Sequence, residues 1–156
     1  MKKKVLCKSA ALALLIIMSS VMVLSPAPAS AGTIVAGGLW AGTASSDYYI
    51  HFRANQRKIY QLAFTGYAAC LTKDTGESFG KSILVGVTQT PVLSMRNGRA
   101  RGQFEVLSDL ERANVRYDIK LAGARGTARL TYWYDIELET CNAGPVRIPV
   151  RRSRAR

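Results

Sequence analysis

One short segment has the spacing of a hydrolase motif. Gly76-Glu77-Ser78-Phe79-Gly80 matches the Gly-x-Ser-x-Gly turn that presents a nucleophilic serine. That turn connects a strand to a helix, and its acid and histidine follow the serine in the chain. Here the residues 82–87 are typical of a strand, and the single histidine, His51, precedes Ser78. We therefore interpret the segment as a polar hairpin connection.

The same segment imitates a phosphate-binding loop, because Gly76 is followed by Gly80-Lys81-Ser82. Such a loop has four residues between its first glycine and the Gly-Lys pair, and here only three are present. The incomplete motif predicts no nucleotide, and we expect no cofactor of any kind.

His51 is the only histidine that could act as an acid or base. It alternates with Ile50 and Phe52, which predicts the solvent side of a strand. General acid–base catalysis needs a positioned partner, and no spacing pairs His51 with one of the candidate carboxylates, which are Asp47, Glu105 and Asp118. A metal-free ribonuclease would suit a basic chain, but we expect the arginines to be scattered over outward strand positions. We predict no catalytic or metal-binding residues and no enzyme.

Three cysteines are present, and Cys7 lies in an N-terminal segment with the features of an export signal. Lys2, Lys3, Lys4 and Lys8 precede an apolar run over residues 10–24, and Ala29-Ser30-Ala31 is a small-x-small cleavage pattern. We predict a signal peptide over residues 1–31, cleaved between Ala31 and Gly32; an uncleaved anchor is the alternative. Because Cys7 precedes the apolar run, lipid attachment is not expected.

Removal of this segment leaves Cys70 and Cys141, which most simply form one disulfide in an exported chain. A metal site would need more Cys and His ligands, and a redox pair would normally be a close Cys-x-x-Cys. The bridge would close a loop of about 70 residues and contribute ~4 kcal/mol.

Residues 32–156 have the length of a single domain. They retain 18 of the 22 Lys and Arg residues and all ten Asp and Glu residues, a net charge of +8. A basic C-terminal tail is expected from about residue 151. An exported basic protein meets anionic cell-wall polymers and membranes, so we expect a secreted or cell-wall-associated protein whose partner is an anionic envelope component or an extracellular protein. No nucleic acid is expected, and no membrane span in residues 32–156.

Period-two alternation dominates these residues and predicts half-buried strands. Val115, Tyr117, Ile119 and Leu121 alternate with polar residues, and the same pattern recurs elsewhere. The other expected inward sets are Tyr48, Ile50 and Phe52; Tyr60, Leu62 and Phe64; Phe104 and Val106; Leu130, Tyr132, Tyr134, Ile136 and Leu138; and Val146, Ile148 and Val150.

Turn-forming segments separate the strands every 8–12 residues or so, including Asn97-Gly98 and Asn142-Ala143-Gly144. Residues 107–113 form either one helical turn or a loop. We predict an all-β antiparallel sandwich of about eight or nine short strands closed by one disulfide, with a small up-and-down barrel as the alternative.

The chain resembles a group of small secreted actinobacterial all-β proteins of uncharacterised function. The resemblance is carried by six elements in order, which are Trp40-Ala41-Gly42-Thr43, Ile50-His51-Phe52, Cys70, Gly102-Gln103-Phe104, Gly126-Thr127-Ala128-Arg129-Leu130 and Cys141-Asn142-Ala143-Gly144. It departs from that group's pattern in its last strand, where Ile148 or Val150 replaces the usual tryptophan. The resemblance implies a β-sandwich with bridged cysteines and no known activity.

Trp133 is the one aromatic residue on the charged side of its predicted strand. It is either a surface contact residue or packs against a neighbouring strand or the Arg152 tail. The favoured function is a non-catalytic secreted or envelope-associated module that binds a polymer or a partner protein. The alternatives are a barrel for a small apolar ligand, suggested by Gly38-Leu39-Trp40, and a secreted hydrolase.

Overall fold

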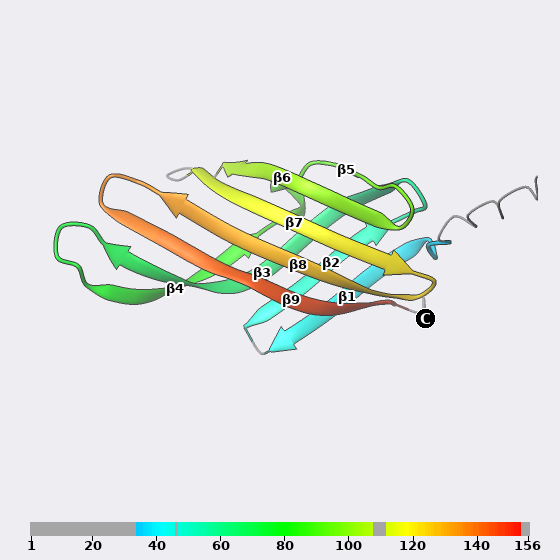
Figure 1. Cartoon of the computed structure of the whole chain (residues 1–156), viewed down its shortest axis with the longest axis horizontal. Helices are drawn as coiled ribbons and strands as arrows, with labels where there is room; N and C mark the ends of the chain where they lie inside the picture. The colour runs from blue at the N-terminus through cyan, green and yellow to red at the C-terminus, as the bar shows by residue number, and fades with distance from the viewer. Residues whose placement is uncertain (1–33, 46, 108–111, 154–156) are drawn as a thin grey trace, which may run out of the picture. The chain divides into compact units, whose positions relative to one another are not determined.

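The computed structural model describes residues 34–45, 47–107 and 112–153, which form nine strands and one 3-10 turn (Figure 1). The elements are β1 (Gly38–Ser45), β2 (Tyr48–Ala54), β3 (Lys58–Thr72), β4 (Ser78–Val85), η1 (Val87–Gln89), β5 (Leu93–Ser94), β6 (Arg99–Leu107), β7 (Arg112–Ala122), β8 (Arg125–Asp135) and β9 (Glu139–Arg152). The predicted signal peptide and its cleavage site lie outside the described residues, as do residues 108–111 of the expected turn or loop. No described helix has the length and apolarity of a membrane span.

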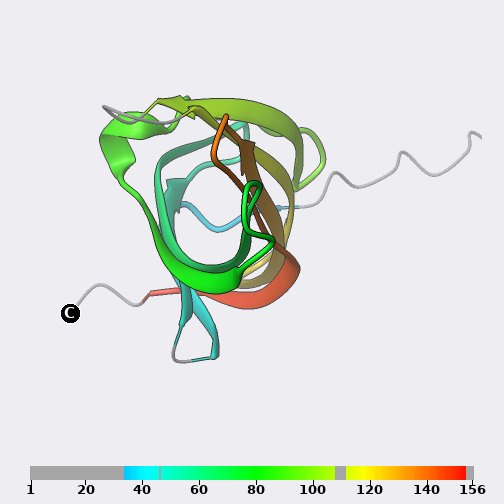
Figure 2. The same ribbon diagram turned by 90° about the vertical axis from the view of Figure 1, so that its left-hand side faces the viewer.

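The strands form one antiparallel sheet in the order β4-β3-β2-β1-β9-β8-β7-β6, with β5 added to β3. β9 closes part of this sheet because it pairs with three strands. One edge of β9 pairs with β8. The other edge pairs with β1 near Val150 and with β3 near Cys141. The all-β prediction is confirmed, but the sheet contains a closed ring of β1, β2, β3 and β9, so two separate sheets are not clearly present (Figure 2).

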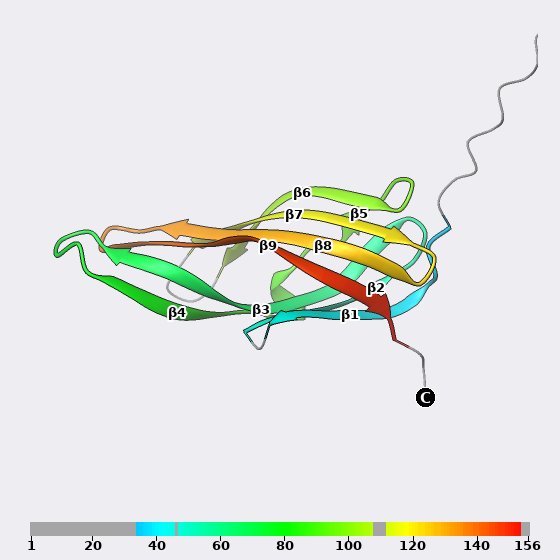
Figure 3. The ribbon, with the colours of Figure 1, turned by 60° about the horizontal axis from the view of Figure 1, so that its bottom comes forward.

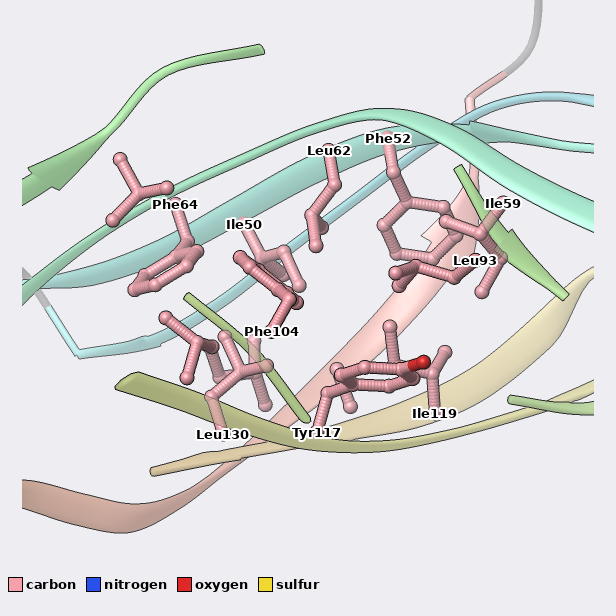
Figure 4. Packing of buried hydrophobic residues seen from close by; sticks show 14 of the residues in the cluster. Ile50, Phe52, Ile59, Leu62, Phe64, Leu93, Phe104, Tyr117, Ile119 and Leu130 are labelled. Atoms are coloured by element: carbon pink, nitrogen blue, oxygen red, sulfur yellow. The ribbon is translucent and has the colours of Figure 1, made fainter. Parts of the chain in front are cut away.

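The core lies between the inward faces of β1–β5 and β6–β9. In Figure 4, Phe52 and Leu62 point toward Tyr117 and Ile119 from the opposite side. Trp40 is fully buried, stacks on Phe52 and donates its indole N–H to the Ala36 carbonyl at 3.1 Å. The tryptophan that suggested a ligand-holding barrel is therefore a core residue.

Alternation predicted most inward positions correctly, among them Val115, Tyr117, Ile119, Leu130 and Tyr134. Four of the predicted inward residues are only half-buried: Tyr48, Tyr132, Ile136 and Val146. The first outright error is in β3, where Ile59 is buried in place of the expected Tyr60. A β-bulge opposite β2 shifts the register between His51 and Arg53, and Gln61 in this bulge has φ 51°.

The second error is at the end of β8. Leu138 was expected to point inward, but it is 59% exposed. The strand ends at Asp135, and the Ile136 amide donates to the Glu139 carbonyl at 2.9 Å across a short turn. Alternation stops where the strand stops, so it no longer assigns Leu138 to the core.

The disulfide is present between Cys70 and Cys141, as predicted. The two residues are directly paired in β3 and β9, with Cα atoms 4.1 Å apart. The bridge therefore covalently joins the two strands whose pairing closes the ring.

The end of β9 corrects one further expectation. β9 continues through Arg152, which pairs with Trp40 of β1, and the Ser153 amide donates to the Leu39 carbonyl at 2.7 Å. Arg151 and Arg152 therefore belong to a strand, and a basic tail can begin only after them.

Candidate functional site: a basic sheet face

The register of β6, β7, β8 and β9 places basic side chains on one outward face. Arg101, Asp118, Arg129 and Arg147 are paired in succession across the four strands. These strands lie side by side in Figures 1 and 3. The prediction that the arginines are scattered is therefore wrong. Each strand carries its basic residues at alternate positions, and only the pairing between strands shows that they share a face.

Three open hollows of about 400, 480 and 610 Å³ indent this face. They adjoin, because the first two share Asp118, Arg129 and Pro145 and the last two share Lys120 and Thr127. The charged residues that line them define what we call the basic face: Arg99, Arg101, Arg116, Lys120, Arg125, Arg129 and Arg147, with the single carboxylate Asp118. The basic face therefore forms a continuous cationic surface.

Arg129 and Arg147 are directly opposite each other in β8 and β9. Like charges in such cross-strand positions are destabilising. Among the residues that the structure describes, neither guanidinium forms an ion pair that would offset the repulsion. Arrangements that destabilise a fold and gain nothing in packing or hydrogen bonding are typical of functional surfaces.

The one carboxylate of the basic face, Asp118, is paired with an arginine of the same face. The Arg99 guanidinium donates two hydrogen bonds to the Asp118 carboxylate, at 2.9 and 2.6 Å. These bonds hold the pKa of Asp118 below its ordinary value, and the same contact raises the pKa of Arg99. Asp118 therefore stays ionised and neutralises mainly Arg99, so the basic face keeps an excess of positive charge.

Trp133 lies at one end of the basic face. It is half-buried, and the Arg116 guanidinium carbon lies 5.4 Å from its ring centre, a cation–π contact. Trp133 is paired with Asn114 on β7 and Asn142 on β9. It does pack against a neighbouring strand, but its partner is Arg116 and not the expected Arg152.

Sequence reasoning missed a second polar cluster, near the disulfide. Lys81 donates to the Tyr134 hydroxyl at 2.8 Å and to the Glu139 carboxylate at 3.0 Å, and the Tyr134 hydroxyl also donates to Glu139. The three residues come from β4, β8 and β9. No sequence motif could reveal the cluster, because Lys81 lies 53 residues from Tyr134 and alternation placed Glu139 on the outward side.

This cluster has the composition of a catalytic site but not its electrostatics. The hydrogen bond from Tyr134, followed by that from Lys81, lowers the pKa of Glu139. A general base is most effective when its pKa is near the working pH, and here the shift goes the other way. The arrangement is better suited to satisfying the buried Tyr134 hydroxyl while clamping β4 to β8 and β9.

Ser78, His51 and Asp118 lie on three different strands of the sheet. Ser78 begins β4 directly after a hairpin turn, in which the Gly76 amide donates to the Thr72 carbonyl at 2.9 Å. The described chain continues from Ser78 as a strand and not as the helix that the motif requires. The hairpin prediction is thus confirmed. His51 lies half-buried on β2, with its ring 5.7 Å from that of Tyr49. Asp118 lies on β7, separated from β2 by three strands in the sheet order.

A small pocket lies among the inward-facing strands of the described residues. This pocket of about 140 Å³ between β4, β6 and β8 is lined by Lys81, Val106, Tyr132, Tyr134 and other residues. Sites for small molecules usually measure about 300–1,000 Å³. In the described residues, no three His, Cys, Asp or Glu side chains gather as a metal site would require.

Comparison with known proteins gives no lead on function. No protein-family model, curated protein or solved structure significantly matches the chain. The site itself therefore carries the functional argument.

Proposed function

We propose that the β domain is a non-catalytic binding module that holds an anionic polymer of the cell envelope on its basic face. The observation that carries the proposal is the opposed pair Arg129 and Arg147, which repel each other and form no ion pair within the described residues. An anion between them would remove this repulsion and accept hydrogen bonds from both guanidinium groups.

The extent of the basic face favours a polymer over a small anion. Neighbouring strands lie about 4.8 Å apart, so the row from Arg101 to Arg147 extends over about 15 Å. Several hydrated anionic groups fit within that length, while a single phosphate would contact one or two arginines.

The proposal places the protein outside the cell or in its wall. The signal-like segment over residues 1–31 supports export. The disulfide supports an oxidising compartment, where such bonds persist. Anionic polymers are abundant in that location, and a cationic surface raises their local concentration and their rate of association.

The other two functions receive less support. A barrel for an apolar ligand would need an internal cavity larger than the pocket of about 140 Å³. A hydrolase would need an acid–base pair, but the apparent motifs are separated and the pKa of Glu139 is lowered.

The test measures binding of the oxidised protein to fluorescent poly(glycerol phosphate), a phosphodiester polymer of the kind found in cell walls. We expect the double variant Arg129→Thr/Arg147→Thr to bind about tenfold more weakly, because two charged contacts are lost. Raising the salt concentration should weaken wild-type binding, because salt screens exposed charges.

The matched control is Arg53→Thr/Arg57→Thr, which removes the same charge from exposed positions away from the basic face. Equal losses in the two variants would show attraction by net charge alone and refute the proposed site. A stability measurement adds a second check. Arg147→Thr should leave the free energy of unfolding unchanged or raise it by a few tenths of a kcal/mol, since it relieves a like-charge pair.

A further inference from the structure

The basic face continues into a neutral strip of different chemistry. Asn114, Trp133 and Asn142 are directly paired across β7, β8 and β9, and together they form the strip. Asn142 also lines the hollow of about 400 Å³ that contains Arg116 and Arg129. A ligand in this hollow would therefore contact guanidinium groups and an amide at the same time.

The polar atoms of the strip remain available to a ligand. Gln103 donates to the side-chain carbonyl of Asn114 at 3.0 Å, which leaves the Asn114 amide protons available. Within the part of the chain that the structure describes, neither the Trp133 indole N–H nor the Asn142 side chain has a hydrogen-bond partner. The strip thus offers donors and acceptors on both sides of a partly exposed indole.

Arg116 connects the strip to the basic face. Its guanidinium lies over the Trp133 ring and lines the same hollow as Arg129. Contact with the ring restrains a long and flexible side chain, so its charge is held where the cationic and neutral regions meet.

This combination corresponds to the chemistry of a charged sugar. A pyranose ring has apolar C–H surfaces that pack on aromatic side chains and a rim of hydroxyls that pair with amides. A carboxylate or phosphate on that ring pairs with arginine. We propose that Asn114, Trp133 and Asn142 form a sugar subsite, and that the polymer held by the basic face is an acidic polysaccharide. This inference rests on the proposed function and narrows its ligand.

The experiment compares two polyanions that each carry about one negative charge per repeating unit, polygalacturonate and inorganic polyphosphate, on the same oxidised protein. Wild-type protein should prefer polygalacturonate. Trp133→Ala should weaken polygalacturonate binding about three- to tenfold, the range of one aromatic contact, and leave polyphosphate binding nearly unchanged. The ratio of the two dissociation constants is the readout, because a general loss of folded protein would weaken both interactions equally.

Three further variants make this test specific. Asn142→Ala alters an exposed side chain without a hydrogen-bond partner in the described residues, so it should fold normally and still reduce the preference for polygalacturonate. Tyr49→Ala removes an exposed aromatic ring from the outward side of β2 and should not change the preference. Arg129→Thr should weaken binding of both polymers.

The outcomes separate the two proposals. If Trp133→Ala and Asn142→Ala leave the ratio unchanged while both polymers bind, the sugar subsite is wrong and the anion-binding function stands. If polygalacturonate does not bind while polyphosphate or poly(glycerol phosphate) does, the acidic polysaccharide is the wrong ligand and the anion-binding function stands. If none of the three polymers binds, both proposals fail. Tighter binding of oligo(dT) or of anionic phospholipid vesicles than of polygalacturonate would also overturn the assignment, because it would identify a nucleic acid or a lipid surface as the occupant.

Discussion

The two outward faces of the β domain are built by the same alternation but differ in charge. The basic face on β6–β9 carries seven basic side chains and one carboxylate. On β3 and β4, by contrast, every outward residue of the paired region is uncharged: Thr65, Tyr67, Ala69, Leu71, Ser78, Gly80, Ser82 and Leu84.

The uncharged face also covers part of its own backbone. The Tyr67 ring lies over Gly80 so closely that a Cβ atom there would lie 1.5 Å from the Tyr67 hydroxyl oxygen. An aromatic ring over a strand glycine is a common way to shield exposed backbone. On the basic face, Arg129 and Arg147 have no comparable internal partner among the described residues. The comparison supports the proposal that the basic face, and not the uncharged face, holds an external ligand.

The disulfide connects the strands that carry these two faces, because Cys70 is on β3 and Cys141 on β9. The double variant Cys70→Ser/Cys141→Ser should lose about 4 kcal/mol of unfolding free energy, since the bridge closes a loop with a sequence separation of 71 residues. Denaturant titration measures the loss, and reduction of the wild-type protein should reproduce it. A variant as stable as the oxidised wild type would show that strand pairing alone holds the faces together.

The basic face rests on the apolar inner side of the same strands. Ile119→Ala should lower the unfolding free energy by about 2–5 kcal/mol, because Ile119 is fully buried and its truncation leaves a cavity. Lys120→Ala, the next residue along β7, should cost under about 0.5 kcal/mol. Urea titrations of both variants decide the matter. If Lys120→Ala is the more damaging change, the inward and outward sides of β7 are reversed.

The smallest expected effect concerns the clamp between β4 and β9. The pKa of Glu139 is lowered from its ordinary value of 4.5, so its contribution to stability is fully present above that pH and is lost as the pH falls through the lowered pKa. Glu139→Gln should therefore lose less stability than the wild type between about pH 5 and pH 3. Chemical denaturation at several pH values measures this difference, with Glu137→Gln as the matched control for one lost carboxylate. Parallel pH profiles for Glu139→Gln and the wild type would contradict the assignment.

Local pattern predicted much of the fold. Alternation identified the buried positions of β7, including Val115, Tyr117 and Ile119, because strand geometry sends successive side chains to opposite sides. Cysteine count and an export-like leader predicted the bridge between Cys70 and Cys141. The alternation pattern failed at Tyr60, where a bulge inserts a residue into β3. It also failed at Leu138, which lies in the turn beyond Asp135, the last residue of β8.

Only the tertiary structure decided what those strands form together. The closure of the sheet depends on β9 meeting both β1 and β3, and no local pattern encodes which strand edges pair. The sequence showed an excess of arginine, but Arg129 and Arg147 are 18 positions apart and become neighbours only through the β8–β9 register. The cluster of Lys81, Tyr134 and Glu139 likewise exists only because three distant strands converge. The sequence alone determines which side of a strand a residue occupies, because that depends on backbone geometry, whereas a binding surface depends on long-range pairing that brings such sides together.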